Sequence, residues 1–368
     1  MHADRLARVR AAMTAQGIDV LLLSVGADLP WLIGYEAMPL ERLTMLVVPV
    51  EADATLVVPR LEAPRVVERP GLFALCPWDE TDDPLDLVAS LAGPAPVAAI
   101  GDRTWAQFLV GLTARMGTTT FRRGSEVTGP LRAVKDPSEI EALARASAAV
   151  DRIAAELQGG AIALAGRTEA EVSAELSRRI LAEGHHRVNF AIVASGPNAA
   201  SPHHEAGERV IQPGEIVLCD FGGTMLTDSG AGYCSDITRC VHVGEPPPEL
   251  AELYAVLHAA QAAGVAAGTV GRPAEEVDGA ARSVIDDAGY GQWFIHRTGH
   301  GIGVEEHEDP YIVAGNSQPL VAGNAFSIEP GIYVPGRWGA RLEDIVVATE
   351  GGPRSLNQAD HRLVAVDA

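Results

Sequence analysis

The sequence is poor in cysteine and in basic residues. Four cysteines in 368 residues are too few for a disulfide framework, and Cys219, Cys234 and Cys240 show no C-x-x-C spacing of a zinc site. Buried or half-buried thiols in a reducing compartment are therefore expected. The 28 Lys and Arg stand against 49 Asp and Glu, which gives a formal net charge of −21. This charge disfavours nucleic acids and anionic membranes as partners.

The first residues also lack the uninterrupted apolar run of a signal peptide. Leu6, Val9 and Met13 instead fall on one face of an expected helix. We expect no run long enough to span a bilayer, and so predict a cytoplasmic protein without a membrane partner. The 47% apolar content permits a large core, and the length is enough for two or three domains.

Strands alternate with helices in the first third of the chain, which predicts an α/β domain over residues 1–130. The expected helices cover residues 3–16 and 84–91, and the expected strands cover 19–24, 43–48, 55–58 and 97–101.

The sequence changes character near residue 131, where an extended segment leads into a long helix that Asp136 or Ser138 can cap. We place a second domain over residues 131–368. Strands with segregated helices predict an α+β domain. The later helices are expected at 168–183, with Thr168 as cap, 248–267 and 273–288, and the strands at 190–194, 216–221, 233–243, 325–328 and 344–349.

Four carboxylates stand in or beside these later strands: Asp220, Asp236, Glu329 and Glu343. A lone Asp at a strand end is more often a turn or capping residue than a ligand. Four carboxylates that converge within one sheet would repel one another, and each would raise the pKa of the others. Two divalent cations would relieve that repulsion.

The segment HRTGHGIG places His296 and His300 four residues apart. On a helix both would share a face and could hold one metal, but Gly299 and Gly301 weaken a helix there. The residues alone leave open whether both histidines, one or neither binds metal. One imidazole with four carboxylates would suit Mn, Co, Fe or Zn, and two such ions form hydrolytic centres in aminopeptidases.

Five segments, in order, resemble the motifs of the pita-bread metallopeptidases: LCDFGG, GYCSDITR, HRTGHGIGVEEHEDP, SIEPGIY and RLEDIV. That family includes Xaa-Pro aminopeptidases, prolidases and methionine aminopeptidases, with the metal-free creatinases as relatives. The resemblance covers residues 130–350 and, more loosely, the first 130. It implies an α/β creatinase-like N-terminal domain followed by an α+β pita-bread catalytic domain, and a homodimer.

The resemblance also implies a ligand set for two divalent metal ions, with manganese the expected metal. Asp220 would chelate the first ion, His300 and Glu329 would bind the second, and Asp236 and Glu343 would bridge both. The stretch between Asp220 and Asp236 is several residues longer than the family pattern. We expect a longer hairpin turn there, formed by Gly223, Asp228, Gly230 and Gly232.

Four further residues match family positions around the substrate. His203 would lie beside the substrate or leaving group, and His307 would stabilise the tetrahedral intermediate. His296 would lie near the substrate without touching metal. Arg341 would support the ligand carboxylates through charge-assisted bonds.

The complete ligand set argues against a creatinase-like function, and the large N-terminal domain argues against a methionine aminopeptidase. The expected reaction is metal-dependent hydrolysis of Xaa-Pro bonds in dipeptides or short peptides, with proline at the second position and Glu329 passing a proton to the leaving nitrogen. Alternatives are an Xaa-Pro aminopeptidase acting on longer peptides and a non-catalytic binding protein on this fold. Arg337 and Arg239 are candidates to bind a dipeptide's terminal carboxylate.

Overall fold

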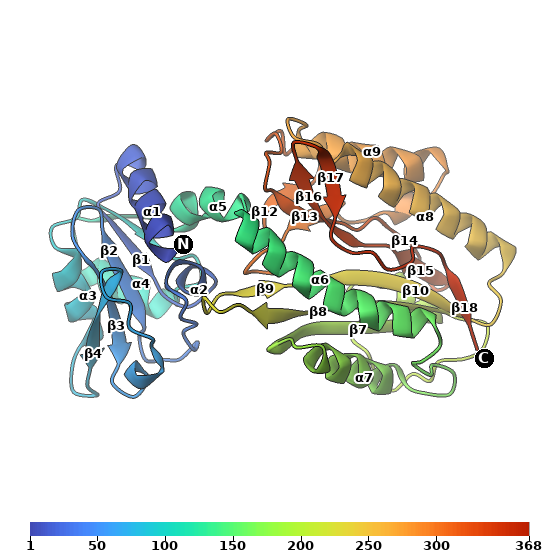
Figure 1. Ribbon diagram of the computed structural model, residues 1–368, viewed down its shortest axis with the longest axis horizontal. Helices are drawn as coiled ribbons and strands as arrows, with labels where there is room; N and C mark the ends of the chain where they lie inside the picture. The colour runs from blue at the N-terminus through green and yellow to red at the C-terminus, as the bar shows by residue number, and fades with distance from the viewer. Residues whose placement is uncertain (368) are drawn as a thin grey trace. The chain divides into compact units, whose positions relative to one another are not determined.

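The computed structural model describes residues 1–367 and divides the chain into two compact units (Figure 1). The first unit consists of Met1–Arg132 together with Thr227–Gly232. The second consists of Ala133–Leu226 and the residues from Tyr233 onward.

The first unit is built on a six-stranded sheet with the order β4-β3-β2-β1-β5-β6. The pairs β1–β5, β5–β6 and β3–β4 are parallel, whereas β1–β2 and β2–β3 are antiparallel. The strands are β1 Val20–Leu23, β2 Met45–Pro49, β3 Ala54–Pro59, β4 Phe73–Trp78, β5 Val97–Ile100 and β6 Thr120–Arg123.

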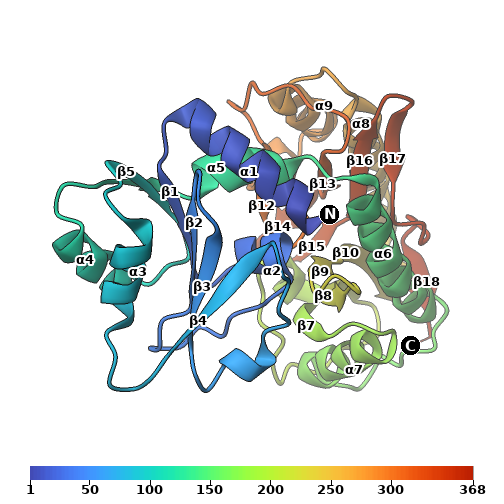
Figure 2. The same ribbon diagram turned by 60° about the vertical axis from the view of Figure 1, so that its left-hand side comes forward.

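Helices cover both faces of this sheet, which confirms the predicted α/β domain. Figure 2 shows α3 and α4 on one side and α1 and α5 on the other. Val88 of α3 and Leu112 of α4 pack on the apolar side chains of β1, β2 and β3. The expected face of α1, Leu6, Val9 and Met13, is buried. The helices are α1 His2–Gln16, α2 Asp28–Ile33, α3 Pro84–Ala92, α4 Ala106–Arg115 and α5 Ser125–Ala133, with a 3₁₀ turn at Ala63–Arg65.

Several elements of this unit are not predicted by the sequence. The two outer strands, β4 and β6, are the clearest cases, because β4 contains Pro77 and β6 reads Thr-Phe-Arg-Arg. Proline and charged side chains are tolerated at sheet edges, where one row of backbone groups needs no partner strand. The alternating apolar pattern of a half-buried strand is therefore missing from both.

The second unit contains two five-stranded sheets and a two-stranded hairpin. One sheet has the order β18-β10-β8-β7, with β9 paired to β8; the other has the order β12-β11-β13-β16-β17; β14 pairs with β15. The strands are β7 Arg187–Ser195, β8 Ile216–Leu226, β9 Gly232–Cys234, β10 Ile237–Val243, β11 Gly299–Gly301, β12 Glu308–Ile312, β13 Ala325–Ile328, β14 Gly331–Val334, β15 Trp338–Arg341, β16 Asp344–Thr349, β17 Gly352–Ser355 and β18 Val364–Val366.

Four helices, α6 Pro137–Gln158, α7 Glu169–Ala182, α8 Pro248–Ala267 and α9 Ala274–Asp287, complete the second unit. Asp136 and Thr168 cap α6 and α7 through full capping boxes, so the predicted helix starts are correct. Val217, Cys219 and Phe221 of β8 pack with residues of α6 and α7, whereas the alternate residues Ile216 and Leu218 pack with α8. Figure 1 shows α6 and α7 beside β7 and β8, with α8 and α9 paired elsewhere in the unit.

Helix α8 overturns one expectation, because its 20 residues are long and apolar enough to cross a membrane by length and composition alone, with a mean hydropathy of 1.2. One face of the helix is buried against the second unit. Leu253 and Leu257 are buried with the side chains of β8 and β10, and Gly264 lies against Ile328. This packing accounts for the apolar composition.

The turn between β8 and β9 belongs to the first unit together with Gly232, the first residue of β9, whereas β8 and the rest of β9 lie in the second. The Ser229 carbonyl accepts a hydrogen bond from Arg69 Nη2 at 3.0 Å, and His2 Nε2 lies 3.2 Å from the same oxygen. Gly230 has a φ of +89° and a Cβ there would lie 2.3 Å from the Gly34 carbonyl oxygen. The long hairpin is as predicted, but Gly223 lies inside β8 and Gly232 begins β9, so neither glycine forms part of the turn.

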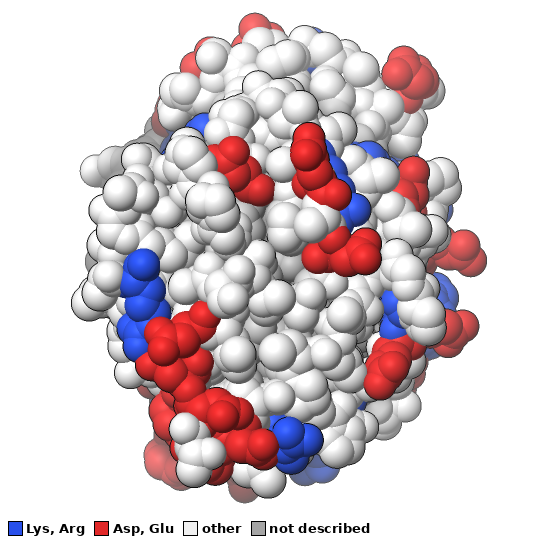
Figure 3. All heavy atoms as spheres, turned by 90° about the vertical axis from the view of Figure 1, so that its left-hand side faces the viewer, with Lys and Arg blue, Asp and Glu red and all other residues white. Residues whose placement is uncertain are grey.

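The acidic composition is visible on the face shown in Figure 3. Asp and Glu side chains gather there in groups, with Lys and Arg side chains beside or between them. Surface ion pairs such as Arg115–Asp86 and Arg60–Asp79 are examples of this arrangement in the first unit. Cys219, Cys234 and Cys240 are free and buried, as expected.

Candidate metal centre

The four candidate carboxylates and His300 meet inside the second unit, but they do not come from one sheet. Asp220 lies on β8 and Asp236 lies between β9 and β10, whereas His300 lies on β11 of the other sheet. Glu329 follows β13, and Glu343 precedes β16. The carboxylates therefore converge from two sheets and not within one. The two sheets are joined at this point by an isolated bridge between Thr238 and Glu343.

The cluster leaves buried oxygens without partners among the described residues. Asp220 Oδ1, Asp236 Oδ1 and Glu343 Oε1 are buried and accept no hydrogen bond. Nε2 of His300 lies 3.2 Å from Glu329 Oε1 and 3.9 Å from Asp236 Oδ2. One ligand atom each of Asp236, His300 and Glu343 lies within 4.8 Å of the other two. Buried carboxylate oxygens without donors are costly unless a cation binds them, so the residues fit a metal.

The charge states of the cluster agree with this fit. Burial raises the pKa of Asp220, Asp236 and Glu343, and neighbouring carboxylates raise it further, while Arg341 offsets part of the shift. Burial also acts to raise the pKa of Glu329, but the hydrogen bond from His300 and nearby positive charges outweigh it and lower the pKa to about 2. Like charges held together in this way favour divalent cations.

The HRTGHGIG segment is extended rather than helical, as its glycines predict. A Cβ on Gly299 would lie 1.9 Å from the Ser327 carbonyl oxygen, and one on Gly301 would lie 2.3 Å from the Asp309 carbonyl oxygen. Only glycine allows β11 to pass so close to its neighbours. The two histidines separate in consequence: His300 joins the carboxylates, whereas His296 Nε2 lies 2.9 Å from the Tyr333 hydroxyl.

Arg341 and Thr238 hold the carboxylates in place. Arg341 is 2% exposed and donates to Asp220 Oδ2 at 2.6 Å and to Thr238 Oγ1 at 3.1 Å. Thr238 Oγ1 donates in turn to Glu343 Oε2 at 2.7 Å, and Arg341 Nη1 donates to the Tyr333 hydroxyl at 2.8 Å. Sequence reasoning identified Arg341 but missed Thr238 and Tyr333, although both stand in the motif segments. The polar Thr238, two residues after the candidate ligand Asp236, was the available signal.

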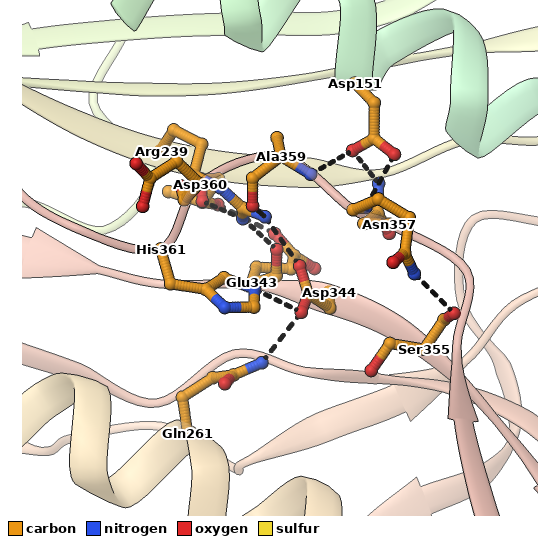
Figure 4. Close-up of polar contacts among 12 residues, drawn as sticks. Asp151, Arg239, Gln261, Glu343, Asp344, Ser355, Asn357, Ala359, Asp360 and His361 are labelled. Atoms are coloured by element: carbon orange, nitrogen blue, oxygen red, sulfur yellow. Dashed lines mark hydrogen bonds and ion pairs between the residues drawn. The ribbon is translucent and has the colours of Figure 1, made fainter.

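Arg239 supports Glu343 from behind and does not bind substrate. Its side chain is 0% exposed, which argues against its predicted role as a partner of a substrate carboxylate. Its guanidinium donates to the Glu343 carbonyl at 2.6 Å and to Asp344 Oδ1 at 2.8 Å (Figure 4). Gln261 and His361 contact the other oxygen of Asp344 at 3.1 and 2.7 Å. The network fixes the backbone that carries Glu343.

The carboxylates and His300 open onto a cavity of about 730 Å³. His203, His296 and His307 all line it, so the predicted substrate-side histidines reach one site. The ring of His307 packs against that of His300, with 4.0 Å between centroids. Burial and the positive charges of His300 and Arg297 lower the pKa of His307 to about 4.

A buried hydrogen-bond network and a buried ion pair anchor the two loops that carry His203 and His307. Glu169 is 0% exposed and accepts hydrogen bonds from Ser195 Oγ at 2.7 Å and from Asn198 Nδ2 at 3.1 Å; His204 Nε2 lies 2.8 Å from it. Lys135, the only lysine in the sequence, pairs with Glu308 in the interior. His204 is next to His203 and Glu308 is next to His307, so these contacts limit the movement of both rings.

Arg337, the other residue predicted to bind a carboxylate, does not reach the site. It is exposed, pairs with Glu249 at 2.8 Å and stacks on Trp338, and it is not among the described residues that line the cavity. Residues for which the sequence analysis assigned no individual role line it instead: Phe190, Ile192, Ser201, Pro202, Ile295, Arg297 and Glu306.

Known proteins with the same organisation match over the full length. The model of metallopeptidase family M24 matches residues 140–350, and that of the creatinase/prolidase N-terminal domain matches residues 5–134. A protein described as probable dipeptidase PepE of Mycobacterium tuberculosis is 45% identical over 370 residues, covering 100% of this chain and 97% of its own. An Xaa-Pro dipeptidase of Lactobacillus delbrueckii subsp. lactis is 35% identical over 384 residues, covering 99% and 98%.

A solved structure agrees with these sequence matches. The crystal structure of dipeptidase PepE from Mycobacterium ulcerans superposes with a TM-score of 0.91 at 45% identity, covering 100% of this chain and 98% of that chain. With the buried carboxylate and histidine cluster in the matched region, these findings establish the fold and the class of enzyme. The chain belongs to metallopeptidase family M24, with a creatinase/prolidase N-terminal domain and a pita-bread catalytic domain.

Proposed function

We propose that this chain hydrolyses Xaa-Pro dipeptides with two divalent cations held by Asp220, Asp236, His300, Glu329 and Glu343. One observation carries the proposal: three buried carboxylate oxygens without hydrogen-bond donors belong to residues that line, together with His300, a cavity of about 730 Å³. Four carboxylates and one imidazole form an oxygen-rich set that favours Mn, Co, Fe or Zn, with Mn as our choice. When bound, such ions polarise the scissile carbonyl and activate water.

His307 is our candidate to stabilise charge on the carbonyl oxygen. Its pKa of about 4 keeps the ring neutral at pH 7, so one ring nitrogen carries a proton and can donate a hydrogen bond. Its contact with the His300 ring keeps it beside the ligands. A fixed donor aimed at a developing oxyanion is the form of stabilisation that contributes most in acyl transfer.

Glu329 is our candidate to move a proton to the leaving nitrogen. Its Oε1 accepts a hydrogen bond from Ser327 Oγ at 3.0 Å and lies near His300, whereas Oε2 has no hydrogen-bond partner among residues 1–367. The nitrogen of an Xaa-Pro bond carries no proton of its own and must receive one before it departs. Oε2 of Glu329 is therefore the atom assigned to that transfer.

Apolar walls support proline as the leaving residue. Phe190 and Ile192 of β7 and Ile295 line the same cavity as the ligands, and Ile295 is 66% exposed. A pyrrolidine ring packed on them would cover apolar surface that otherwise meets water. The Xaa-Pro dipeptidase of L. delbrueckii, 35% identical, supports the same substrate class.

The proposal is tested with Ala-Pro, Ala-Pro-Ala and Ala-Ala as substrates, before and after chelation. We expect Ala-Pro to be cleaved fastest, activity to vanish on exhaustive chelation, and Mn²⁺ to restore it. Full activity on Ala-Pro after chelation would refute a metal-dependent reaction. Faster cleavage of Ala-Pro-Ala would instead establish the aminopeptidase alternative. Light scattering on the same protein tests the homodimer that we also propose.

A further inference from the structure

Two imidazole rings lie beside each other outside the candidate metal centre. His258 of α8 and His361, which stands between β17 and β18, have ring centroids 5.9 Å apart and planes inclined by 40°. Neither is among the described residues that line the cavity of the ligand cluster. His258 is exposed and the side chain of His361 is 31% exposed. The pair is therefore separate from the substrate cavity and accessible to dissolved ions.

A buried carboxylate fixes the ring of His361. Nε2 of His361 lies 2.7 Å from Asp344 Oδ2, and Asp344 is itself held by Arg239 at 2.8 Å and Gln261 at 3.1 Å (Figure 4). An ionised carboxylate accepts hydrogen bonds and donates none, so Nε2 carries the proton and Nδ1 of the neutral ring presents its lone pair. Within residues 1–367, no hydrogen bond reaches that Nδ1. Histidines that bind metal ions are oriented by a carboxylate in this way.

Helix α8 supplies the second ring at a fixed place. Gln261 follows His258 by three residues, so the two side chains share one face of the helix. Gln261 is 2% exposed and donates to Asp344 Oδ2, the same oxygen that His361 contacts. This contact holds the helix face against His361 and keeps His258 beside it. No hydrogen bond or ion pair joins His258 to another described residue, so its ring nitrogens have no competing partner in residues 1–367.

The separation of the rings suits a single metal ion. Two imidazoles bound to one ion have centroids roughly 5–6 Å apart, because each metal–nitrogen bond is about 2.0–2.1 Å long. The observed 5.9 Å falls within that range, so rotation of the exposed His258 ring is enough to complete a chelate with His361. Two nitrogen donors favour Cu²⁺, Ni²⁺ and Zn²⁺, whereas Mn²⁺ favours oxygen donors such as the carboxylates of the ligand cluster.

We propose that His258 and His361 together bind one divalent ion of the Cu²⁺, Ni²⁺ and Zn²⁺ class, with water as the remaining ligands and Asp344 orienting His361. The site goes beyond the proposed hydrolysis, because it shares no ligand with the candidate metal centre and requires no substrate.

The test measures nickel binding to the full chain, prepared without a polyhistidine tag and loaded with Mn²⁺. The protein is dialysed against Ni²⁺ in an excess of Mn²⁺, and both metals are then counted per chain by elemental analysis. We expect the wild type to bind one more Ni²⁺ than His258→Gln. His361→Gln should lose the same ion. The matched control is His186→Gln, which removes an exposed histidine outside the pair and should bind as much Ni²⁺ as the wild type.

The comparison of the wild type with His258→Gln decides the outcome. Any Ni²⁺ that replaces Mn²⁺ in the candidate metal centre is counted equally in both proteins, so the difference between them reports the histidine pair alone. Thermal unfolding gives a second measurement: Ni²⁺ should raise the Tm of the wild type by more than that of His258→Gln, and the two Tm values should agree without it. Equal nickel content in the two proteins would overturn the proposal, as would an equal rise in Tm.

Discussion

Replacing Asp236 by asparagine should stabilise the metal-free protein while removing its response to metal. The metal-free site holds Asp236 as a buried carboxylate with an oxygen that accepts no hydrogen bond, beside Glu343 and Asp220. Asparagine has the same shape without the charge, and its amide can donate to a neighbouring carboxylate. Relief of one such buried group contributes about 1–3 kcal/mol. For a domain of 150–250 residues, about 2 kcal/mol raises Tm by about 4–8 °C.

Bound metal should reverse the order of stability, so that the wild type becomes more stable than Asp236→Asn. At a concentration one hundred times Kd, bound metal stabilises the wild type by about 2.7 kcal/mol, or about 5–11 °C in Tm. Asp236→Asn should gain little, because it lacks a ligand. The assay is thermal unfolding of both proteins after chelation and again with Mn²⁺. Asp228→Asn is the matched control, because Asp228 is exposed in the turn between β8 and β9 and its loss should change stability by less than about 0.5 kcal/mol.

Two results would refute this reasoning. A metal-free Asp236→Asn less stable than the metal-free wild type would mean that Asp236 has a partner in the folded protein. An equal rise in Tm for both proteins on adding Mn²⁺ would mean that the metal binds elsewhere.

Three further predictions follow from single contacts. Gly299→Ala should cost about 3 kcal/mol in denaturant unfolding, because its Cβ would meet the Ser327 carbonyl at 1.9 Å, whereas Gly279→Ala, with open space in α9, should not destabilise. Tyr333→Phe should lower kcat/KM about tenfold or more, since Arg341 and His296 both lose a partner; an unchanged value would exclude that role. Burial lowers the pKa of His185 below 6.5, so stability should be full above pH 6.5 and fall as the pH drops towards the lowered value, with a smaller slope in His185→Gln; identical slopes would contradict this.

The ligand cluster was predictable because each ligand stands in a short segment that its neighbours make conspicuous. Asp220 follows Ile-Val-Leu-Cys, and Glu329 follows Ala-Phe-Ser-Ile, so each carboxylate stands out against an apolar strand. The helix starts at Asp136 and Thr168 were equally predictable, because a capping box involves residues only three apart in sequence. In these cases the neighbouring residues in the sequence are enough to predict the ligand or the start of the helix.

The arrangement of the sheets was not predictable by the same means. Asp220 and His300 belong to different sheets, and the bridge between Thr238 and Glu343 that brings them together spans more than a hundred residues of chain. Pairing at that distance depends on the packing of the whole unit and leaves no periodic signal.

The positions of individual arginines could also be determined only from the structure. Arg239, Arg297 and Arg337 look alike in sequence, yet one is fully buried, one lines the cavity and one is exposed. A long charged side chain can lie in the interior, line a cavity or extend into solvent, and the residues around it determine which of these occurs.

The most direct test of the central claim is a metal titration of the chelated enzyme, with bound Mn²⁺ and Ala-Pro hydrolysis measured on the same samples. The account predicts tight binding of two Mn²⁺ ions per chain, with activity that levels off at two equivalents and is absent without metal. Activity that is independent of added metal, or a chain that binds no Mn²⁺ at these levels, would contradict it.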